Sequence, residues 1–359
     1  MTDKTIQDLK ATVQETYTLL EEKTPFTFVD VRSEGGFNPA DYSEGEGYEF
    51  VHIPFSDFEQ NLAETAQKLP QNGKLVMMCQ SGRMNKMVTE LLMDQPFDML
   101  WMEGGLNAWR KFFTTKPVLE SDAGSIFQIA RPGRGDLSYV VLSDGEAILI
   151  DPMRKIELYL DFIQEKDAEL VAVLDSHNHA DRISGGRFIA EETGAPYFKH
   201  PYDAIHLVDK LPMQAPYHFL KDGDTWNIGQ FEIKAVWFPG HTLGMTNFLL
   251  TTPEGKQYLF TGDGIFMQSI GRPDLMGEGE PWARMLYESL NKRLDFITPH
   301  TLILPAHFTL FTEMNEDGLY AATYEEIQKT NPMLKPMGED EFITYVLKDV
   351  PTAPPEYLE

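Results

Sequence analysis

Histidine and aspartate side chains that could bind a metal recur at predicted strand ends in the second part of the chain. The segment SHNHADR places His177, His179 and Asp181 directly after the apolar stretch LVAVLD. Imidazole and carboxylate groups are common metal ligands, and residues just past neighbouring strands can converge at one edge of a sheet. The spacing therefore predicts a metal site. Three later motifs each add one potential ligand after a predicted strand: PGHTLGM adds His241, TGDG adds Asp263 and LPAHF adds His307.

The single cysteine, Cys79, is the other candidate for chemistry. It ends the apolar run KLVMMC, and Gln80-Ser81-Gly82 turns the chain into a helix that we predict to start near Met84. Unpaired backbone N–H groups and the positive end of the helix dipole would stabilise a thiolate there. The same N–H groups could hold a persulfide or an oxyanion. A buried, inert cysteine is the alternative interpretation.

The elements that must position Cys79 form a repeated strand and helix pattern. Apolar runs at 26–32 and 74–79 indicate buried strands, and residues 84–94 and 105–113 have helical periodicity. This alternation predicts a parallel sheet covered by helices on both faces. Residues 114–124 lack periodicity and collect Pro, Ser, Asp and Gly, so we predict a linker there.

After this linker the pattern changes to hairpins and mixed elements. The stretch LSYVVLSDGEAILIDP alternates around Asp144-Gly145, a strong hairpin signal. These features predict a second domain built as a sandwich of two sheets with outer helices, and an α/β two-domain chain divided into 1–118 and 119–359. Further strands are predicted at 170–175, 231–237, 246–251, 257–261 and 301–304.

Composition excludes several classes of partner. The formal net charge is −26, from 56 acidic and 30 basic side chains. This charge repels phosphate backbones and anionic membrane surfaces, so we expect no nucleic acid or membrane partner. The first residues lack the apolar region of a signal peptide, and no apolar stretch approaches the length of a membrane span. We therefore expect a cytoplasmic protein. One cysteine excludes an intrachain disulfide.

Residues 1 to about 115 resemble the rhodanese family. The resemblance rests on the strand FVDVR at 28–32, the loop CQSGR at 79–83 and the segment EGGLNAW at 103–109. It implies that Cys79 carries or transfers sulfane sulfur. The loop departs from the family's Cys-x-x-Gly-x-Arg pattern, because Met84 takes the place of the arginine, which lies one step earlier at Arg83.

Residues 125–359 resemble the metallo-β-lactamase superfamily and imply its αββα sandwich. The superfamily motif His-x-His-x-Asp-His ends here in Arg182 instead of the last histidine. In dinuclear members that histidine, the preceding aspartate and the final histidine form the second metal site. A guanidinium cannot coordinate a metal and should repel it. The resemblance therefore implies one metal per chain.

Within the superfamily the chain resembles the persulfide dioxygenases most, through HADRISG, IGRPDL (270–275) and NPMLKPMGEDEF (331–342). The resemblance implies a mononuclear iron held by His177, His241 and Asp263. Two imidazoles and a carboxylate with open positions suit ferrous iron that binds oxygen and substrate together. The remaining implied roles are a weaker or outer-sphere ligand for His179, ligand or water orientation for Asp181 and His307, and a carboxylate contact to a thiol cofactor for Arg272. A turn-bracing pair with Asp274 is the alternative for Arg272.

We predict a sulfur-metabolism enzyme that uses one Fe(II) and O₂ to oxidise a low-molecular-weight persulfide to sulfite and thiol, coupled to sulfur transfer at Cys79. The first alternative is a zinc-dependent thioester hydrolase of the glyoxalase II kind with a non-catalytic, sulfur-binding rhodanese domain. The second is a sensing module with a silent metal domain. The sequence leaves open the thiol carrier, such as glutathione or coenzyme A, and a homo-oligomeric state.

Overall fold

The computed structural model describes residues 5–38, 48–179, 181–204, 216–274 and 279–348. Leu275, the last residue of the IGRPDL motif, lies outside them. The chain divides into two compact units. The first contains Met1–Thr114, Ala130–Gly135 and Thr309–Gly318, and the second contains Thr115–Ile129, Asp136–Phe308 and Leu319–Glu359. The boundary between residues 118 and 119 stays a prediction.

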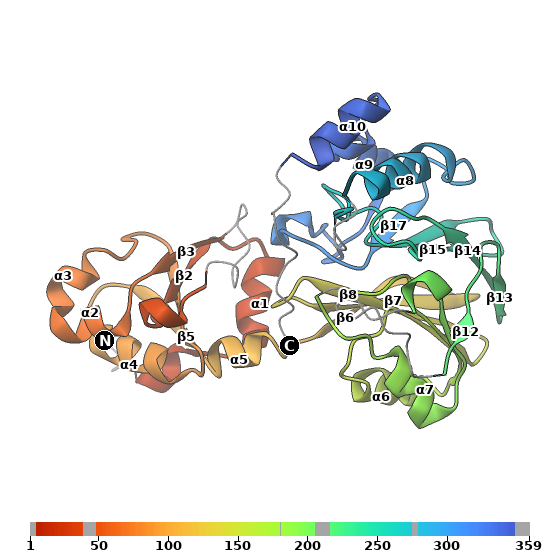
Figure 1. The fold of residues 1–359 in the computed structure, drawn as a ribbon. Coiled ribbons are helices and arrows are strands. Elements are labelled where there is room, and N and C mark those ends of the chain that lie inside the picture. Colours follow the sequence, from red (N-terminus) through yellow and green to blue (C-terminus); the bar gives the residue numbers. More distant parts are fainter. Residues whose placement is uncertain (1–4, 39–47, 180, 205–215, 275–278, 349–359) are drawn as a thin grey trace. The chain divides into compact units, whose positions relative to one another are not determined.

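The first unit is built on a five-stranded sheet in the order β1-β5-β4-β2-β3 (Figure 1). Every pairing in this sheet is parallel, as the alternating pattern predicted. The strands are β1 (Lys10–Ala11), β2 (Phe26–Asp30), β3 (Tyr48–His52), β4 (Lys74–Met78) and β5 (Asp98–Met102). The helices are α1 (Val13–Glu21), α2 (Phe55–Gln60), α3 (Leu62–Ala66), α4 (Arg83–Leu92) and α5 (Gly105–Trp109).

Both faces of this sheet are covered, because successive side chains of β4 enter different cores. Leu75 and Met77 pack in one core with residues of α2, α3 and α4. Val76 and Met78 pack in the other with residues of α1 and α5. Since successive strand residues point to opposite faces, the helices lie on both sides of the sheet. The predicted arrangement is confirmed.

A late segment of the chain completes the second of these cores. Thr309–Gly318 belongs to the first unit although it follows the candidate ligand His307 in sequence. The ring of Phe311 lies 5.6 Å from that of Tyr48 and 6.1 Å from that of Trp109, centroid to centroid. The Tyr17 hydroxyl donates to Met314 Sδ at 3.7 Å. Residues 1–118 alone would therefore leave part of this core uncovered.

Truncation of Met314 should destabilise the first unit. The side chain is 4 % exposed, and Met→Ala at buried positions costs about 2 kcal/mol or more. We expect Met314→Ala to lower the free energy of unfolding of the first unit by that amount in urea titrations. The control is Met87→Ala on α4, because Met87 is 39 % exposed. Equal midpoints for the two variants would show that the segment contributes nothing to this core.

The second unit is a sandwich of two mixed sheets, a seven-stranded one in the order β12-β11-β10-β9-β8-β7-β6 and a six-stranded one in the order β13-β14-β15-β16-β17-β18. The first sheet contains β6 (Thr114–Ser121), β7 (Gly124–Arg131), β8 (Asp136–Ser143), β9 (Glu146–Ile150), β10 (Glu169–Leu174), β11 (Tyr197–Lys199) and β12 (His218–Phe219). The second contains β13 (Thr225–Ile228), β14 (Phe231–Trp237), β15 (Thr246–Thr251), β16 (Gln257–Gly262), β17 (Leu302–Pro305) and β18 (Ala322–Thr323).

Helices cover the outer faces of the sandwich, as predicted. Figure 1 shows α6 (Glu157–Glu165) and α7 (Gly186–Thr193) beside the seven-stranded sheet. The helices α8 (Gly279–Lys292), α9 (Tyr324–Thr330) and α10 (Glu339–Val346) share one core with the six-stranded sheet. Between the sheets, the rings of Tyr139 and Phe260 meet at 4.9 Å. None of the helices among the described residues is both long and apolar enough to cross a membrane.

The predicted linker at 114–124 is wrong for most of its length. Residues Thr114–Ser121 form β6, the edge strand of the seven-stranded sheet beside β7. Its side chains are partly or fully exposed throughout, so apolar periodicity is weak. An edge strand also tolerates Pro117, because one side of its backbone has no partner strand. The hairpin at Asp144-Gly145 is confirmed: both residues have positive φ, and β8 and β9 pair antiparallel.

Candidate metal centre and cysteine loop

Three of the predicted ligands converge in the second unit. His177 follows β10, His241 follows β14 and Asp263 follows β16 directly. Asp263 Oδ2 lies 3.5 Å from Nε2 of His177 and 3.5 Å from Nε2 of His241. One ligand atom from each residue lies within 4.8 Å of the others, and all three side chains are buried. The strand ends therefore bring two imidazoles and one carboxylate to a single point.

Hydrogen bonds to the other ring nitrogens turn both imidazoles toward this point. His241 Nδ1 donates to the Arg272 carbonyl at 2.9 Å, which leaves the Nε2 lone pair available. His177 Nδ1 is hydrogen-bonded to Ser176 Oγ at 2.8 Å, and its Nε2 has no hydrogen-bond partner among the described residues. Burial lowers the pKa of His241 to about 4, so this ring is neutral at neutral pH. The arrangement fits a divalent metal ion.

His307 holds the carboxylate of Asp263 in place. Its Nδ1 donates to Asp263 Oδ1 at 2.7 Å, and its Nε2 donates to Asp181 Oδ2 at 2.7 Å. Burial alone would lower the pKa of His307, but the carboxylates of Asp181 and Asp263 raise it well above its usual value. His307 is therefore a cation that donates from both nitrogens, and it leaves Asp263 Oδ2 to face the two imidazoles. This is the orienting role that the sequence implied for His307.

Asp136 joins this group, and no motif indicated it. Its Oδ1 lies 3.2 Å from His307 Nε2 and 3.6 Å from Arg182 Nη1. Asp136 begins β8, and a short β-bridge to His307 brings it to the site from a strand remote in sequence. No local sequence pattern indicates that Asp136 contacts His307 and Arg182, because a single acidic residue before a strand is common in proteins.

Arg182 places a fixed positive charge beside a second group of potential metal ligands, Asp136, Asp181 and His307. Its side chain is only 4 % exposed. Its Nη2 donates to the Leu137 carbonyl at 3.2 Å and lies 3.4 Å from His179 Nε2. Burial alone would lower the pKa of Arg182, but the carboxylates of Asp136 and Asp181 raise it. The guanidinium therefore stays charged beside Asp136 and Asp181, two members of this second group.

His179 is not part of the group in which the three candidate ligands meet. Its Nε2 lies 3.3 Å from Asp151 Oδ1, on the side of Arg182. Burial, followed by the charge of Arg182, lowers the pKa of His179 well below its usual value, so its ring is neutral. Its ring centroid is 4.1 Å from that of His177. Its Nδ1 is buried and has no hydrogen-bond partner among the described residues, and metal binding by His179 stays a prediction.

Replacement of Arg182 by histidine should create a second metal site. Arg182→His removes the buried cation and adds an imidazole next to Asp181 and His307. We expect the metal content of protein loaded with excess Zn²⁺ to rise from about one to about two ions per chain. The control is Arg187→His on α7, where the arginine side chain is 46 % exposed. Equal metal content in the two variants would show that Arg182 does not limit the number of metals.

The IGRPDL motif packs against two of the candidate ligands, His241 and Asp263. The Gly271 N–H donates to the Asp263 carbonyl at 2.8 Å, and a Cβ at position 271 would lie 2.6 Å from His241 Nδ1. Only glycine allows this close approach. Arg272 Nε donates to Asp274 Oδ1 at 2.6 Å, and Nη2 pairs with Oδ2 of the same carboxylate. The turn-bracing pair is therefore present, and a contact from Arg272 to a ligand carboxylate stays a prediction.

In the first unit, Cys79 follows β4 and is fully buried. Gly82 has φ of +83° and α4 begins at Arg83, one residue before the predicted start. The EGGLNAW segment packs on this loop: the Leu106 N–H donates to the Cys79 carbonyl at 2.9 Å, where a Cβ on Gly105 would lie 2.1 Å from that oxygen. The close packing of the cysteine loop against the EGGLNAW segment therefore requires glycine at position 105.

Asn85 directs the cysteine thiol, although no sequence pattern pointed to it. Its Nδ2 donates at 2.9 Å to the carbonyls of Met77 and of Met102, which fixes the orientation of the amide. Cys79 Sγ then lies 3.5 Å from Asn85 Oδ1 as a donor. Arg83 is exposed, whereas Met84 packs on the core. A sulfur-transfer role for Cys79 stays a prediction.

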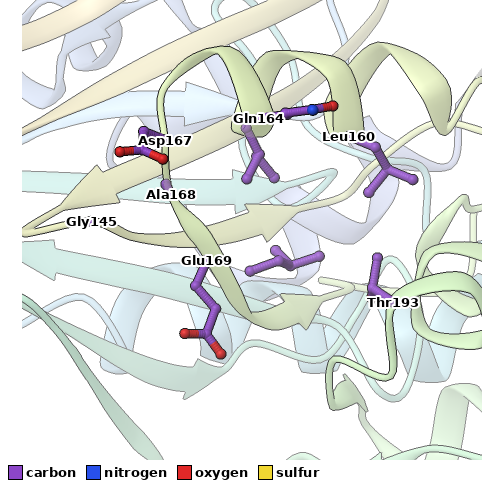
Figure 2. A pocket seen from close by; sticks show the side chains of 9 residues that line it. Gly145, Leu160, Gln164, Asp167, Ala168, Glu169 and Thr193 are labelled. Atoms are coloured by element: carbon purple, nitrogen blue, oxygen red, sulfur yellow. The ribbon is translucent and has the colours of Figure 1, made fainter.

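A surface pocket of the second unit lies apart from these residues. Figure 2 shows its lining at the end of α6, with Leu160 and Gln164 on the helix, Asp167 in the turn that follows it and Glu169 at the start of β10. Neither the three candidate ligands nor Arg182 lines it. We therefore do not assign this pocket to the candidate metal centre.

Comparison with known proteins identifies both parts of the chain. The family model described as metallo-beta-lactamase superfamily matches residues 131–307, and the model described as rhodanese-like domain matches residues 12–112. The mouse (Mus musculus) protein named persulfide dioxygenase ETHE1, mitochondrial, is 30% identical over 200 residues, which cover 55% of this chain and 70% of the relative. The chain belongs to the metallo-β-lactamase superfamily. It joins a metallo-β-lactamase domain to a rhodanese-like domain, as the resemblances implied.

Other members of the metallo-β-lactamase superfamily match the same part of the chain. The probable polyketide biosynthesis zinc-dependent hydrolase BaeB of Bacillus velezensis is 30% identical over 166 residues, which cover 46% of this chain and 68% of the relative. The crystal structure of a metallo-beta-lactamase from Staphylococcus aureus aligns with a TM-score of 0.54 and 27% identity, over 67% of this chain and 68% of that chain. The superfamily implies a metal, and the names of its members include both a dioxygenase and a hydrolase.

Proposed function

We propose that the chain is an iron-dependent persulfide dioxygenase whose rhodanese-like domain exchanges sulfane sulfur at Cys79. The observation that carries the proposal is the cluster of His177, His241 and Asp263, with the Arg182 cation beside Asp136 of the second group of potential ligands. Three protein ligands leave coordination positions open for two small molecules. The 30% identity to a persulfide dioxygenase supports the same conclusion.

In this proposal the side chains hold and orient one Fe(II). His177 and His241 present Nε2 because Ser176 Oγ and the Arg272 carbonyl engage their Nδ1 atoms. His307 holds Asp263 through its other carboxylate oxygen. Bound ferrous iron supplies the electron-transfer chemistry that lets O₂ react with a sulfur substrate. The protein contributes a dry, fixed donor set and one buried cation, Arg182.

The overall reaction is RS–SH + O₂ + H₂O → RSH + H₂SO₃. The S–S bond breaks, the sulfane sulfur is oxidised, O₂ is reduced and the carrier leaves as its thiol. Glutathione and coenzyme A are the thiol carriers we propose. At Cys79, the thiolate attacks the sulfane sulfur of a donor persulfide, a new S–S bond forms on the protein and the donor leaves as its thiolate.

The alternative is a zinc-dependent thioester hydrolase with a rhodanese-like domain that only binds sulfur. The identity to a probable zinc-dependent hydrolase favours it. In a hydrolase the metal activates water for attack on a carbonyl. The arginine at position 182 argues against the dinuclear form of such a site, because a second metal loses one ligand and meets a positive charge.

Two substrates offered to the same preparation test the proposal. Protein purified without oxygen and loaded with one Fe(II) should consume O₂ when glutathione persulfide is added, and should leave a glutathione thioester intact. The matched control is the same protein loaded with Zn²⁺, which should consume no O₂. Thioester hydrolysis by the zinc form without O₂ uptake by the iron form would establish the hydrolase instead.

A further inference from the structure

A buried carboxylate outside every motif joins the two loops that supply the histidine ligands. Asp203 ends the 3-10 helix η4 (Pro201–Asp203) and is 5 % exposed. Its Oδ2 accepts from the Asn178 N–H at 2.8 Å and from Thr242 Oγ1 at 2.5 Å. Its Oδ1 accepts from the Gly244 N–H at 2.7 Å. One carboxylate therefore takes three hydrogen bonds from two separate loops.

The positions of the donors connect Asp203 to the candidate ligands. Asn178 is the residue after His177, and Thr242 is the residue after His241. Gly244 allows the second loop to approach closely, since a Cβ there would lie 2.6 Å from Asp203 Cγ. Hydrogen bonds from backbone N–H groups to a carboxylate are short and strong. Asp203 therefore connects the two loops.

We propose that Asp203 is a positioning residue that fixes His177 and His241 at the separation a metal requires. It is not a ligand, because its two oxygens are engaged by the loops. Among the described residues it belongs to neither group of potential metal ligands, which are His177 with His241 and Asp263, and Asp136 with Asp181 and His307. Ser176 and Arg272 orient each ring individually. Asp203 adds a connection between the two loops, which the ring hydrogen bonds of Ser176 and Arg272 do not provide. The inference rests on the metal centre of the proposed function.

The substitution Asp203→Asn tests this role with little change in volume. Asparagine has one acceptor oxygen, so its NH₂ group must face either the Gly244 N–H or the two donors at Oδ2. In the first case the Gly244 N–H loses its acceptor and the second loop keeps only the hydrogen bond from Thr242, whereas in the second case the Asn178 N–H loses its acceptor and the first loop loses its attachment. Loss of such partners weakens metal binding about 10- to 100-fold. We expect that loss in the affinity for Fe(II) and for Co²⁺, measured without oxygen by competition with a chelator.

Two further variants separate positioning from general loss of stability. Thr242→Ser keeps the hydroxyl donor and should bind metal with nearly the affinity of the native protein. Asp30→Asn removes another buried carboxylate, one that is paired with Arg32 in the first unit, and should lower stability without changing metal affinity. The absorption spectrum of bound Co²⁺ adds a readout of ligand geometry that a purely structural role would not alter.

The outcomes separate this inference from the proposed function, because the titration uses metals alone and no persulfide. Weaker metal binding and an altered Co²⁺ spectrum in Asp203→Asn, with Asp30→Asn unchanged in both, are expected. Native affinity and spectrum in folded Asp203→Asn would overturn the role of Asp203 and leave the metal centre standing. A native protein that binds neither Fe(II) nor Co²⁺ would overturn both the metal centre and the role of Asp203.

Discussion

His241→Ala is expected to reduce metal affinity by more than about 100-fold, since loss of a direct ligand should exceed the cost of losing an outer partner. The imidazole is one of the three groups that converge on the candidate centre among the described residues. Iron content after purification without oxygen should fall from about one ion per chain to a trace. Oxygen uptake on a persulfide should disappear with it.

The control for this variant is His300→Ala, which removes an exposed histidine outside the cluster. Its iron content and oxygen uptake should match those of the native protein. Iron retained at native affinity in His241→Ala would mean that the three converging residues are not the metal site. In that case the neighbouring group of Asp136, Asp181 and His307 would have to be tested as ligands.

Cys79→Ser should abolish sulfur loading and leave oxygen uptake on a preformed small persulfide largely intact. The chain has no other cysteine, so no second thiol can accept the sulfur. The serine hydroxyl is nearly isosteric with the thiol, and Asn85 Oδ1 can still accept from it, so the buried loop should keep its structure. Mass spectrometry after exposure to a sulfane-sulfur donor should detect one added sulfur in the native protein and none in the variant.

Oxygen uptake and iron content measured on the same Cys79→Ser sample decide whether the two activities are separable. Iron-loaded variant that still consumes O₂ supports two independent sites. If oxygen uptake stops while iron stays bound, the persulfide must first load onto Cys79, and the proposal of separable activities would be wrong.

Local sequence patterns were sufficient to locate several strands of the second unit and the residues that follow those strands. Apolar runs located β10, β14, β15, β16 and β17 to within a residue or so at each end. This succeeds because a buried strand must be apolar and a residue just past its end is held at the sheet edge. That rule predicted that the loops with His177, His241 and Asp263 converge, whereas the choice of these three as the ligand set came from the resemblance to the persulfide dioxygenases.

The direction of a side chain depends on partners that local sequence does not contain. His179 shares the loop of His177, yet its ring turns toward Asp151, which follows a different strand. Asp136 and Asp203 reach the site from β8 and η4 as single acids without a motif. Hydrogen bonds between remote segments decide all three positions, so a pattern confined to neighbouring residues gives no signal for them.

Local sequence patterns also failed to indicate the edge strand β6 and the segment Thr309–Gly318. β6 is recognisable only through its pairing with β7, because its side chains are not buried. Thr309–Gly318 follows the candidate centre in sequence but packs in the first unit. Membership of a core is a property of tertiary structure, and a short polar segment with two apolar anchors, Phe311 and Met314, carries too little apolar pattern to indicate which core it joins.

The stoichiometry of the reaction tests the central claim most directly. Protein purified without oxygen and loaded with Fe(II) is mixed with glutathione persulfide, and O₂ consumed, sulfite formed and glutathione released are measured in the same vessel. The balanced reaction predicts equal amounts of all three, and none from the Zn²⁺-loaded protein or from His241→Ala. Persulfide loss without O₂ consumption, or equal O₂ consumption by the iron-free protein, would contradict an iron-dependent persulfide dioxygenase.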